Sequence, residues 1–218
     1  MFPVAEHFIS INGEGTRAGE IAAFIRFRLC NLNCSYCDTK WANNNDSPAE
    51  FMSAEELTNW VIASGVKNVT LTGGEPLLQR DLKKLVDMLM ENGLRVEIET
   101  NGSIPVGNND YNSRPVFTID YKLPSSGEEK RMHSDNFRYL NKNDTVKFVA
   151  GSKADLIRAA EVIDEYNLCE QCHVYFSPVF GKIEPVEIVN FLIDNKLSDV
   201  RLQLQLHKYI WDPEKRGV

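Results

Sequence analysis

The sequence has no apolar run approaching the length of a membrane span, and its amino terminus lacks a basic region followed by an apolar stretch. It is also short of basic residues, because 24 Lys and Arg stand against 31 Asp and Glu and give a net charge of −7. Nucleic-acid-binding proteins normally present a basic face. We therefore expect a cytoplasmic protein that binds neither membrane nor nucleic acid and acts on a small molecule.

Internal repeats, low-complexity segments and an obvious interdomain linker are absent as well, so we expect residues 1–218 to form a single domain. Five cysteines, an odd number with three on one short stretch, do not fit a disulfide framework. Cys169 and Cys172 form a CxxC pair that could serve in redox chemistry or metal binding. Two thiols without further ligands nearby are more often unreactive at an element boundary, and we favour that interpretation.

The other three cysteines, Cys30, Cys34 and Cys37, follow an apolar run at residues 21–29 that we predict to be a strand. Thiolates at this spacing on a curled loop can converge on an iron-sulfur cluster. Three local ligands leave one iron of a four-iron cluster open to a substrate or chelating cofactor, as in catalytic zinc sites. The alternatives are structural zinc and buried reduced thiols. We favour the cluster because the paired CxxC or HxxxH spacing of zinc sites is missing.

The hydrophobic pattern predicts an alternation of strands and helices. A capping box at Ser53 and Glu56 begins a helix that Gly65 ends, and Pro185 opens another that runs to about residue 195. Further helices are predicted at 79–92 and 152–166, and strands at 21–29, 66–71, 94–100, 116–121, 145–150, 174–177 and 200–206. This order is typical of an α/β fold with an incomplete, TIM-like barrel of mostly parallel strands. The polar segment 122–143 is interpreted as a surface excursion or lid.

Several predicted strands carry polar residues on one face, although a parallel strand covered on both faces is normally apolar throughout. We expect these faces to line a polar cavity for an anionic ligand, with Arg26 as its cationic contact. The alternative is that they meet solvent at open edges. The residues are Arg26 and Arg28, Glu97 and Glu99, Asp120 and Lys122, and Gln203, Gln205 and His207.

The sequence Thr-Gly-Gly-Glu-Pro at 72–76 directly follows the second predicted strand. Paired glycines at a strand end let a ligand approach the backbone without meeting a Cβ atom. An ordinary tight turn is an equally good interpretation of this stretch alone.

Taken with the CxxxCxxC spacing, these motifs resemble the radical S-adenosylmethionine (SAM) enzymes. The resemblance implies a radical SAM core in which a 4Fe-4S cluster on Cys30, Cys34 and Cys37 cleaves SAM to a 5′-deoxyadenosyl radical. By the same resemblance Gly74 and Glu75 contact SAM, and Thr72 reaches the substrate.

Five further matches narrow the resemblance to the 7-carboxy-7-deazaguanine synthase family: ISINGEG at 9–15, Arg26, CDT at 37–39, ETNG at 99–102 and QLHKYIW at 205–211. The family is a group of lyases in queuosine and deazapurine biosynthesis that converts 6-carboxy-5,6,7,8-tetrahydropterin to 7-carboxy-7-deazaguanine. The resemblance implies Mg²⁺ on Thr39, an electron donor such as flavodoxin or ferredoxin, and a homodimer. It also places the pterin and its carboxylate on Ile11, Asn12, Gly13, Glu14, Arg26 and His207. No residue is assigned as a catalytic acid or base, and Asn12 stands where the family commonly has Gln.

Two other functions share part of this pattern. A glycyl-radical activating enzyme would have the same cysteine and GGE motifs but would act on a protein partner. A metal-binding module would need a fourth protein ligand and would not bind SAM. Taken singly, Glu14 could be a solvated loop acid, Thr39 a turn residue and His207 a hydrogen-bonded core histidine. Their joint occurrence favours the small-molecule enzyme.

Overall fold

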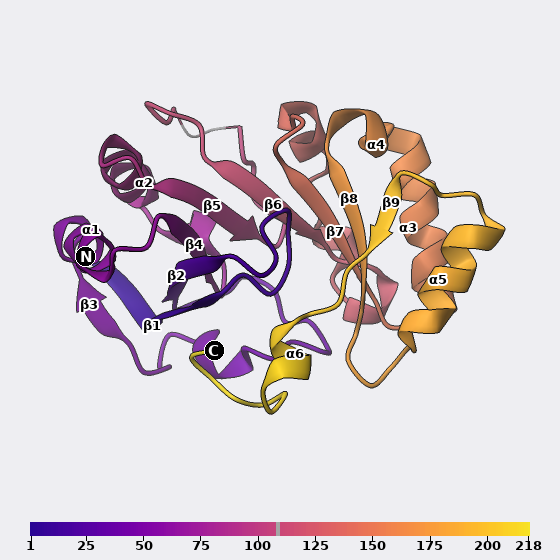
Figure 1. Ribbon diagram of the computed structural model, residues 1–218, viewed down its shortest axis with the longest axis horizontal. Coiled ribbons are helices and arrows are strands. Elements are labelled where there is room, and N and C mark those ends of the chain that lie inside the picture. The colour runs from indigo at the N-terminus through magenta and orange to yellow at the C-terminus, as the bar shows by residue number, and fades with distance from the viewer. Residues whose placement is uncertain (108–109) are drawn as a thin grey trace.

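The computed structural model describes residues 1–107 and 110–218, and it is built around one nine-stranded sheet. The strands lie in the order β3-β1-β2-β4-β5-β6-β7-β8-β9, so the sheet is open, with β3 and β9 at its edges (Figure 1). Their bounds are β1 Phe2–Ile11, β2 Ile21–Phe27, β3 Glu50–Met52, β4 Asn68–Gly73, β5 Arg95–Thr100, β6 Val116–Tyr121, β7 Thr145–Ala150, β8 His173–Pro178 and β9 Val200–Leu202. All pairings from β2 to β9 are parallel, which confirms the predicted partial barrel.

The longer helices cover the outside of the curved sheet (Figure 1). They are α1 (Ala54–Ser64), α2 (Leu82–Glu91), α3 (Lys153–Tyr166) and α5 (Pro185–Asp194), and two short helices are α4 (Leu168–Gln171) and α6 (His207–Ile210). Their apolar faces and the sheet form one core that includes Leu57, Leu89, Ile98, Phe148 and Phe176. Within the described residues, no helix is long and apolar enough to cross a membrane.

The amino-terminal strand was not predicted. β1 pairs antiparallel with both β2 and β3, and β3 was missed as well. β1 places His7 and Glu6 among its apolar residues, and Pro3 lies near its start, so no clear apolar run or regular alternation marks it. β3 has only three residues. Both strands are held by tertiary pairing rather than by a local pattern.

The predicted strand at 200–206 was too long. β9 ends at Leu202, residues 203–206 are irregular, and His207 begins α6 instead of continuing a strand. The Gln203 amide turns toward the loop after β1, where it accepts from the Gly15 N–H at 2.7 Å and donates to the Gly15 carbonyl at 2.9 Å. The Gln203 N–H still donates to Phe176 O of β8 at 2.8 Å, and the chain leaves β8 after this residue although the alternating sequence continues.

The segment 122–143 packs on the core through three short 3-10 helices, η3 (Pro124–Ser126), η4 (Glu129–Arg131) and η5 (Ser134–Tyr139). Phe137 and Ser126 are buried, and the Ser126 carbonyl accepts from the backbone N–H of Ser35 at 3.0 Å. The segment therefore braces the cysteine loop from outside.

Candidate active site

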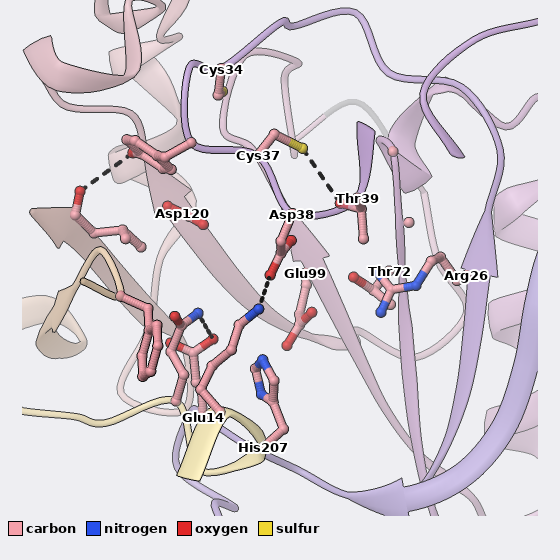
Figure 2. Close-up of a pocket in the computed structure, with 18 of the residues that line it drawn as sticks. Glu14, Arg26, Cys34, Cys37, Asp38, Thr39, Thr72, Glu99, Asp120 and His207 are labelled. Carbon is pink, nitrogen blue, oxygen red and sulfur yellow. Dashed lines mark hydrogen bonds and ion pairs between the residues drawn. The ribbon is translucent and has the colours of Figure 1, made fainter. Parts of the chain in front are cut away.

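A cavity of about 650 Å³ lies at the carboxyl ends of the parallel strands. It brings together residues from the whole chain, and Figure 2 shows Glu14, Arg26, Thr72, Glu99 and His207 facing a common space. Eleven of the predicted site residues line it: Ile11, Gly13, Glu14, Arg26, Cys30, Cys34, Cys37, Thr39, Thr72, Gly74 and His207. Polar faces of β2, β5 and β6 contribute to the lining, as the strand pattern predicted.

The cysteine loop follows β2, and N–H donors reach the sulfur atoms of Cys30 and Cys37. The Leu32 backbone N–H donates to Cys30 Sγ at 3.4 Å, and the Asn101 amide lies 3.6 Å from the same sulfur. The Asn43 amide donates to Cys37 Sγ at 3.4 Å. Such donors stabilise negative charge on sulfur, so the donor chemistry suits thiolate ligands of an iron-sulfur cluster.

Burial raises the pKa of Cys30, and it raises the pKa of Cys34 to about 11. Metal ligation must therefore displace protons from these thiols. Among residues 1–107 and 110–218, no three His, Cys, Asp or Glu side chains are gathered to hold one ion. The three thiols share a loop and a cavity wall, and rotation about their Cα–Cβ bonds moves the sulfurs while leaving that loop in place.

The glycines at the end of β4 let the cysteine loop pass close to the backbone. A Cβ atom on Gly74 would lie 2.0 Å from the Leu29 carbonyl oxygen, and one on Gly73 would lie 2.3 Å from that of Phe27. The Gly74 N–H donates to Phe27 O at 2.9 Å. The paired glycines were predicted to let a ligand approach the backbone. In this structure the backbone of residues 27–30 makes that close approach, and the contact fixes the start of the cysteine loop.

Glu75 is fully buried and does not line the cavity. Its carboxylate accepts from Thr100 Oγ1 at 2.9 Å and from the backbone N–H groups of Asn101 at 2.7 Å and Leu77 at 3.0 Å. Burial raises the pKa of Glu75 to about 7, although these donors oppose the rise. In this structure Glu75 orders the end of β5, and its contact with SAM stays a prediction.

At the other end of the cavity, Glu14 is held by three donors. Lys147 Nζ lies 3.0 Å from Glu14 Oε2, Gln205 Nε2 lies 3.3 Å from the same oxygen, and Ser177 Oγ lies 3.2 Å from Oε1. Burial opposes the charge on Lys147, but Glu14 and Asp120 outweigh it and raise the pKa of Lys147. Glu14 is therefore a fixed carboxylate rather than a solvated loop acid.

Lys147 was missed from the sequence, although a lysine within a fully buried strand is itself a signal. It lies 3.6 Å from Asp120 Oδ2, which in turn pairs with Lys122 at 2.9 Å. The charge of Lys122 lies near Cys34. Alternating charges thus run from Glu14 to the cysteine loop.

His207 lies against the loop after β1. A Cβ atom on Gly13 would be 2.8 Å from His207 Nδ1, so only glycine leaves room for the ring. Burial lowers the pKa of His207, which favours the neutral imidazole at pH 7. Beside it, burial opposes the charge of Asp38, but the Lys208 ammonium at 3.2 Å outweighs this and lowers the pKa of Asp38 (Figure 2).

Other predicted residues lie outside the cavity lining. Asn12 is buried, and its Oδ1 accepts from Thr70 Oγ1 at 2.9 Å. Its backbone N–H donates to Glu20 O and its carbonyl accepts from the Gly19 N–H, both at 2.8 Å, so its contact with a substrate stays a prediction. Arg28 donates to the Ser47 carbonyl at 3.1 Å. Glu97 is buried behind the cavity. A polar strand face therefore predicted the cavity but not each of its residues.

Cys169 and Cys172 lie at α4, away from the cavity, and neither forms a disulfide. Cys172 is buried and donates to the Leu168 carbonyl at 3.5 Å. Burial raises the pKa of Cys172 to about 12, which disfavours the reactive thiolate. These features agree with an unreactive structural pair.

An open parallel barrel with three cysteines on the loop after β2 is the architecture of a radical SAM enzyme, and residues 24–108 match the model of the Radical SAM superfamily. The chain is 52% identical to a 7-carboxy-7-deazaguanine synthase from Clostridium acetobutylicum, over 100% of this chain and 99% of that protein. It is 38% identical to one from Chlorobaculum tepidum, over 99% and 96% of the two chains. This protein belongs to the 7-carboxy-7-deazaguanine synthase family.

The crystal structure of QueE from Escherichia coli has the same fold, with a TM-score of 0.70, 24% identity and 93% of each chain covered. Membership of the radical SAM superfamily implies a 4Fe-4S cluster and SAM, and the three thiols, with N–H donors to Cys30 and Cys37, suit that cluster. Membership of this family argues against the two alternative functions, a glycyl-radical activating enzyme and a metal-binding module.

Proposed function

We propose that this protein converts 6-carboxy-5,6,7,8-tetrahydropterin to 7-carboxy-7-deazaguanine with loss of ammonia, and that SAM and Mg²⁺ are required. The observation that carries the proposal is the single cavity in which Glu14, Arg26 and His207 face the cysteine loop. Relatives of matching length that are named 7-carboxy-7-deazaguanine synthase support the choice of substrate.

Cys30, Cys34 and Cys37 would hold the 4Fe-4S cluster, whose chemistry when bound is the one-electron reduction of SAM that starts radical chemistry on the substrate. The protein's own residues would orient that substrate. Arg26 would bind its carboxylate, because a guanidinium matches a carboxylate in charge and shape. Glu14, positioned by its ion pair with Lys147, would accept hydrogen bonds from the guanidine-like edge of the pterin. The walls of the cavity would limit the contact of the radical with other C–H bonds.

Thr39 would hold Mg²⁺. Its hydroxyl lines the cavity 3.5 Å from Cys37 Sγ, so a hard oxygen stands beside the soft cluster ligands (Figure 2). The nearby Asp38 carboxylate is engaged by Lys208. Mg²⁺ commonly keeps water and takes substrate oxygens with only one or two protein ligands. A single threonine therefore suits an ion completed by the substrate carboxylate.

The proposal includes the partners and organisation that the family implies. Residues 1–218 would act as one cytoplasmic radical SAM domain, reduced by a flavodoxin or ferredoxin. We also propose a homodimer, supported by an exposed apolar stripe of Val186, Val189 and Ile193 along α5. Light scattering during gel filtration tests the dimer, and a monomer at micromolar concentration would exclude it.

The test of function is anaerobic turnover of the cluster-loaded protein with dithionite, SAM, Mg²⁺ and 6-carboxytetrahydropterin, with product followed by mass. We expect 7-carboxy-7-deazaguanine only when all components are present. Cys34→Ala should abolish it, and Arg26→Ala should raise KM for the pterin. Cleavage of SAM without deazaguanine would remove the substrate assignment while leaving the radical SAM class intact.

A further inference from the structure

Arg26 is held in place by one neighbour. Its Nε donates to Glu6 Oε1 at 2.8 Å, and both side chains line the cavity with about 19% of their surface exposed. Within the described part of the chain, the Arg26 side chain makes no other hydrogen bond or ion pair. The two terminal nitrogens of the guanidinium are thus left for a ligand, and Figure 2 shows them beside Thr72.

A β-bulge creates this pair. Val4 lies opposite Phe27, so regular antiparallel pairing would place Ala5 opposite Arg26, but the register shifts and Glu6 takes that position. A bulge inserts one residue and re-aims the side chains that follow it. Strand β1, which the sequence pattern did not predict, therefore places Glu6 opposite Arg26, the predicted carboxylate-binding arginine.

We propose that Glu6 is a positioning residue that pre-orients Arg26 to receive the substrate carboxylate through both terminal nitrogens. This inference rests on the proposed function, because it concerns the same carboxylated ligand. An arginine side chain has many rotamers, and fixing one before binding lowers the entropic cost of recognition. Use of Nε by Glu6 leaves the end of the planar fork for two parallel hydrogen bonds.

Because Glu6 is negatively charged, a positioning role and a purely electrostatic effect predict different results when it is removed. A carboxylate beside Arg26 repels the incoming substrate carboxylate, so removal of Glu6 would tighten binding if charge alone mattered. Removal of a positioning residue would weaken binding instead. Glu6→Ala therefore gives opposite results under the two accounts. Glu6→Gln removes the charge but keeps an oxygen that accepts from Nε.

The experiment measures binding of two fluorescent probes, 6-carboxypterin and unsubstituted pterin, to the cluster-loaded protein with SAM and Mg²⁺. The quantity compared is the ratio of the two dissociation constants. We expect Glu6→Ala to lower the preference for 6-carboxypterin by roughly 3- to 10-fold, the range for one side chain left to be immobilised on binding. Glu6→Gln should retain the preference, and so should Glu50→Ala on edge strand β3, whose side chain is 69% exposed.

Three results would overturn the inference: an unchanged or tighter preference in Glu6→Ala, an equal loss of affinity for both probes, or a loss in Glu6→Gln as large as in Glu6→Ala. If Glu6→Ala does not fold, Glu6→Asp replaces it, because the shorter carboxylate keeps the charge but withdraws from Nε. If wild-type protein makes product and the variants give any of these three results, only the role of Glu6 is refuted. Wild-type protein with neither turnover nor a preference for 6-carboxypterin refutes the proposed function itself.

Discussion

The carbonyl oxygen of Leu29 occupies the place where a side chain on residue 74 would begin. We expect Gly74→Ala to destabilise the fold by about 3 kcal/mol or more, because the clash is with the backbone of Leu29 and Cys30 and cannot be relieved by a rotamer change. The iron content of this variant after anaerobic reconstitution should also be lower than that of wild type, because the cysteine loop begins at this contact. Urea unfolding and iron analysis measure the two effects.

Gly151→Ala is the matched control for that variant. A Cβ atom on Gly151 would meet its neighbours at 3.4 to 3.6 Å, which is ordinary packing distance. The control should unfold close to wild type and load iron normally. Equal behaviour of the two variants would contradict the role given to Gly74.

Glu97 should make the protein less stable as pH rises. Burial, with the Glu99 charge nearby, raises the pKa of Glu97 to about 7, so the folded state binds this proton more tightly than the unfolded state. The free energy of unfolding therefore falls between about pH 4.5 and 7, by roughly 3 kcal/mol from this group. Glu97→Gln keeps an oxygen that accepts from Thr118 Oγ1. Because glutamine does not titrate, this variant should not show the part of the fall in the free energy of unfolding that Glu97 causes.

Urea unfolding at pH 5 and pH 8 checks this prediction. Glu165→Gln, on the exposed side of α3, should leave the pH dependence unchanged. A Glu97→Gln variant that loses as much stability as wild type between the two pH values would show that Glu97 is not the source.

At the scale of single elements, α1 illustrates a locally encoded boundary. Ser53 Oγ accepts from the Glu56 N–H at 3.1 Å, and Glu56 Oε2 accepts from the Ser53 N–H at 2.7 Å. Ser53→Ala should lower the free energy of unfolding by about 1 kcal/mol, whereas Ser53→Asp, which can still cap, should lose less. Chemical denaturation of the two variants measures the difference, and equal losses would contradict a capping role.

Elements with local signals were predicted well, and those fixed by distant contacts were not. The start and end of α1, and all of β6 and β7, follow from capping residues, Gly65 and compact apolar runs. β1 is defined by partners on either side of it, and β9 is shortened by Gln203 bonding to Gly15. Neither effect can be derived from a window of neighbouring residues.

The same division holds for the candidate site. Motif residues such as Cys30 and Thr39, which line the cavity, were predicted because their neighbours in sequence mark them. Glu6 and Lys147 were missed because each acts through a partner on another strand, Arg26 or Glu14. Sequence motifs indicated the residues expected to contact ligands, and the structure added those that hold them in place.

At the scale of the whole molecule, the loop after β1 is joined to the carboxyl-terminal part of the chain by several contacts, and Gln203 makes two of them. Gln203 exchanges two hydrogen bonds with Gly15, and the Leu206 N–H donates to Gly13 O at 3.1 Å. Gln203→Ala should destabilise the fold by about 1–3 kcal/mol, because it leaves the Gly15 N–H unpaired and leaves the Gly15 carbonyl with only the Ala18 N–H at 3.4 Å. The Gly15 amide should then exchange with deuterium faster.

Gln203→Glu gives a graded control, because it keeps an acceptor for the Gly15 N–H and loses the donor to the Gly15 carbonyl. It should fall between wild type and Gln203→Ala in both stability and exchange rate. Unchanged exchange at Gly15 in Gln203→Ala would show that other contacts hold this loop.

The contact between Glu14 and Gln205 spans 191 positions of the chain. During synthesis Glu14 emerges from the ribosome near the beginning and Gln205 near the end, so a nascent chain presents its three cysteines long before the pocket beside them can close. Assembly of an oxygen-sensitive cluster on that half-built protein would leave it open to solvent. The order of translation therefore favours delivery of iron and sulfide after the chain has been released.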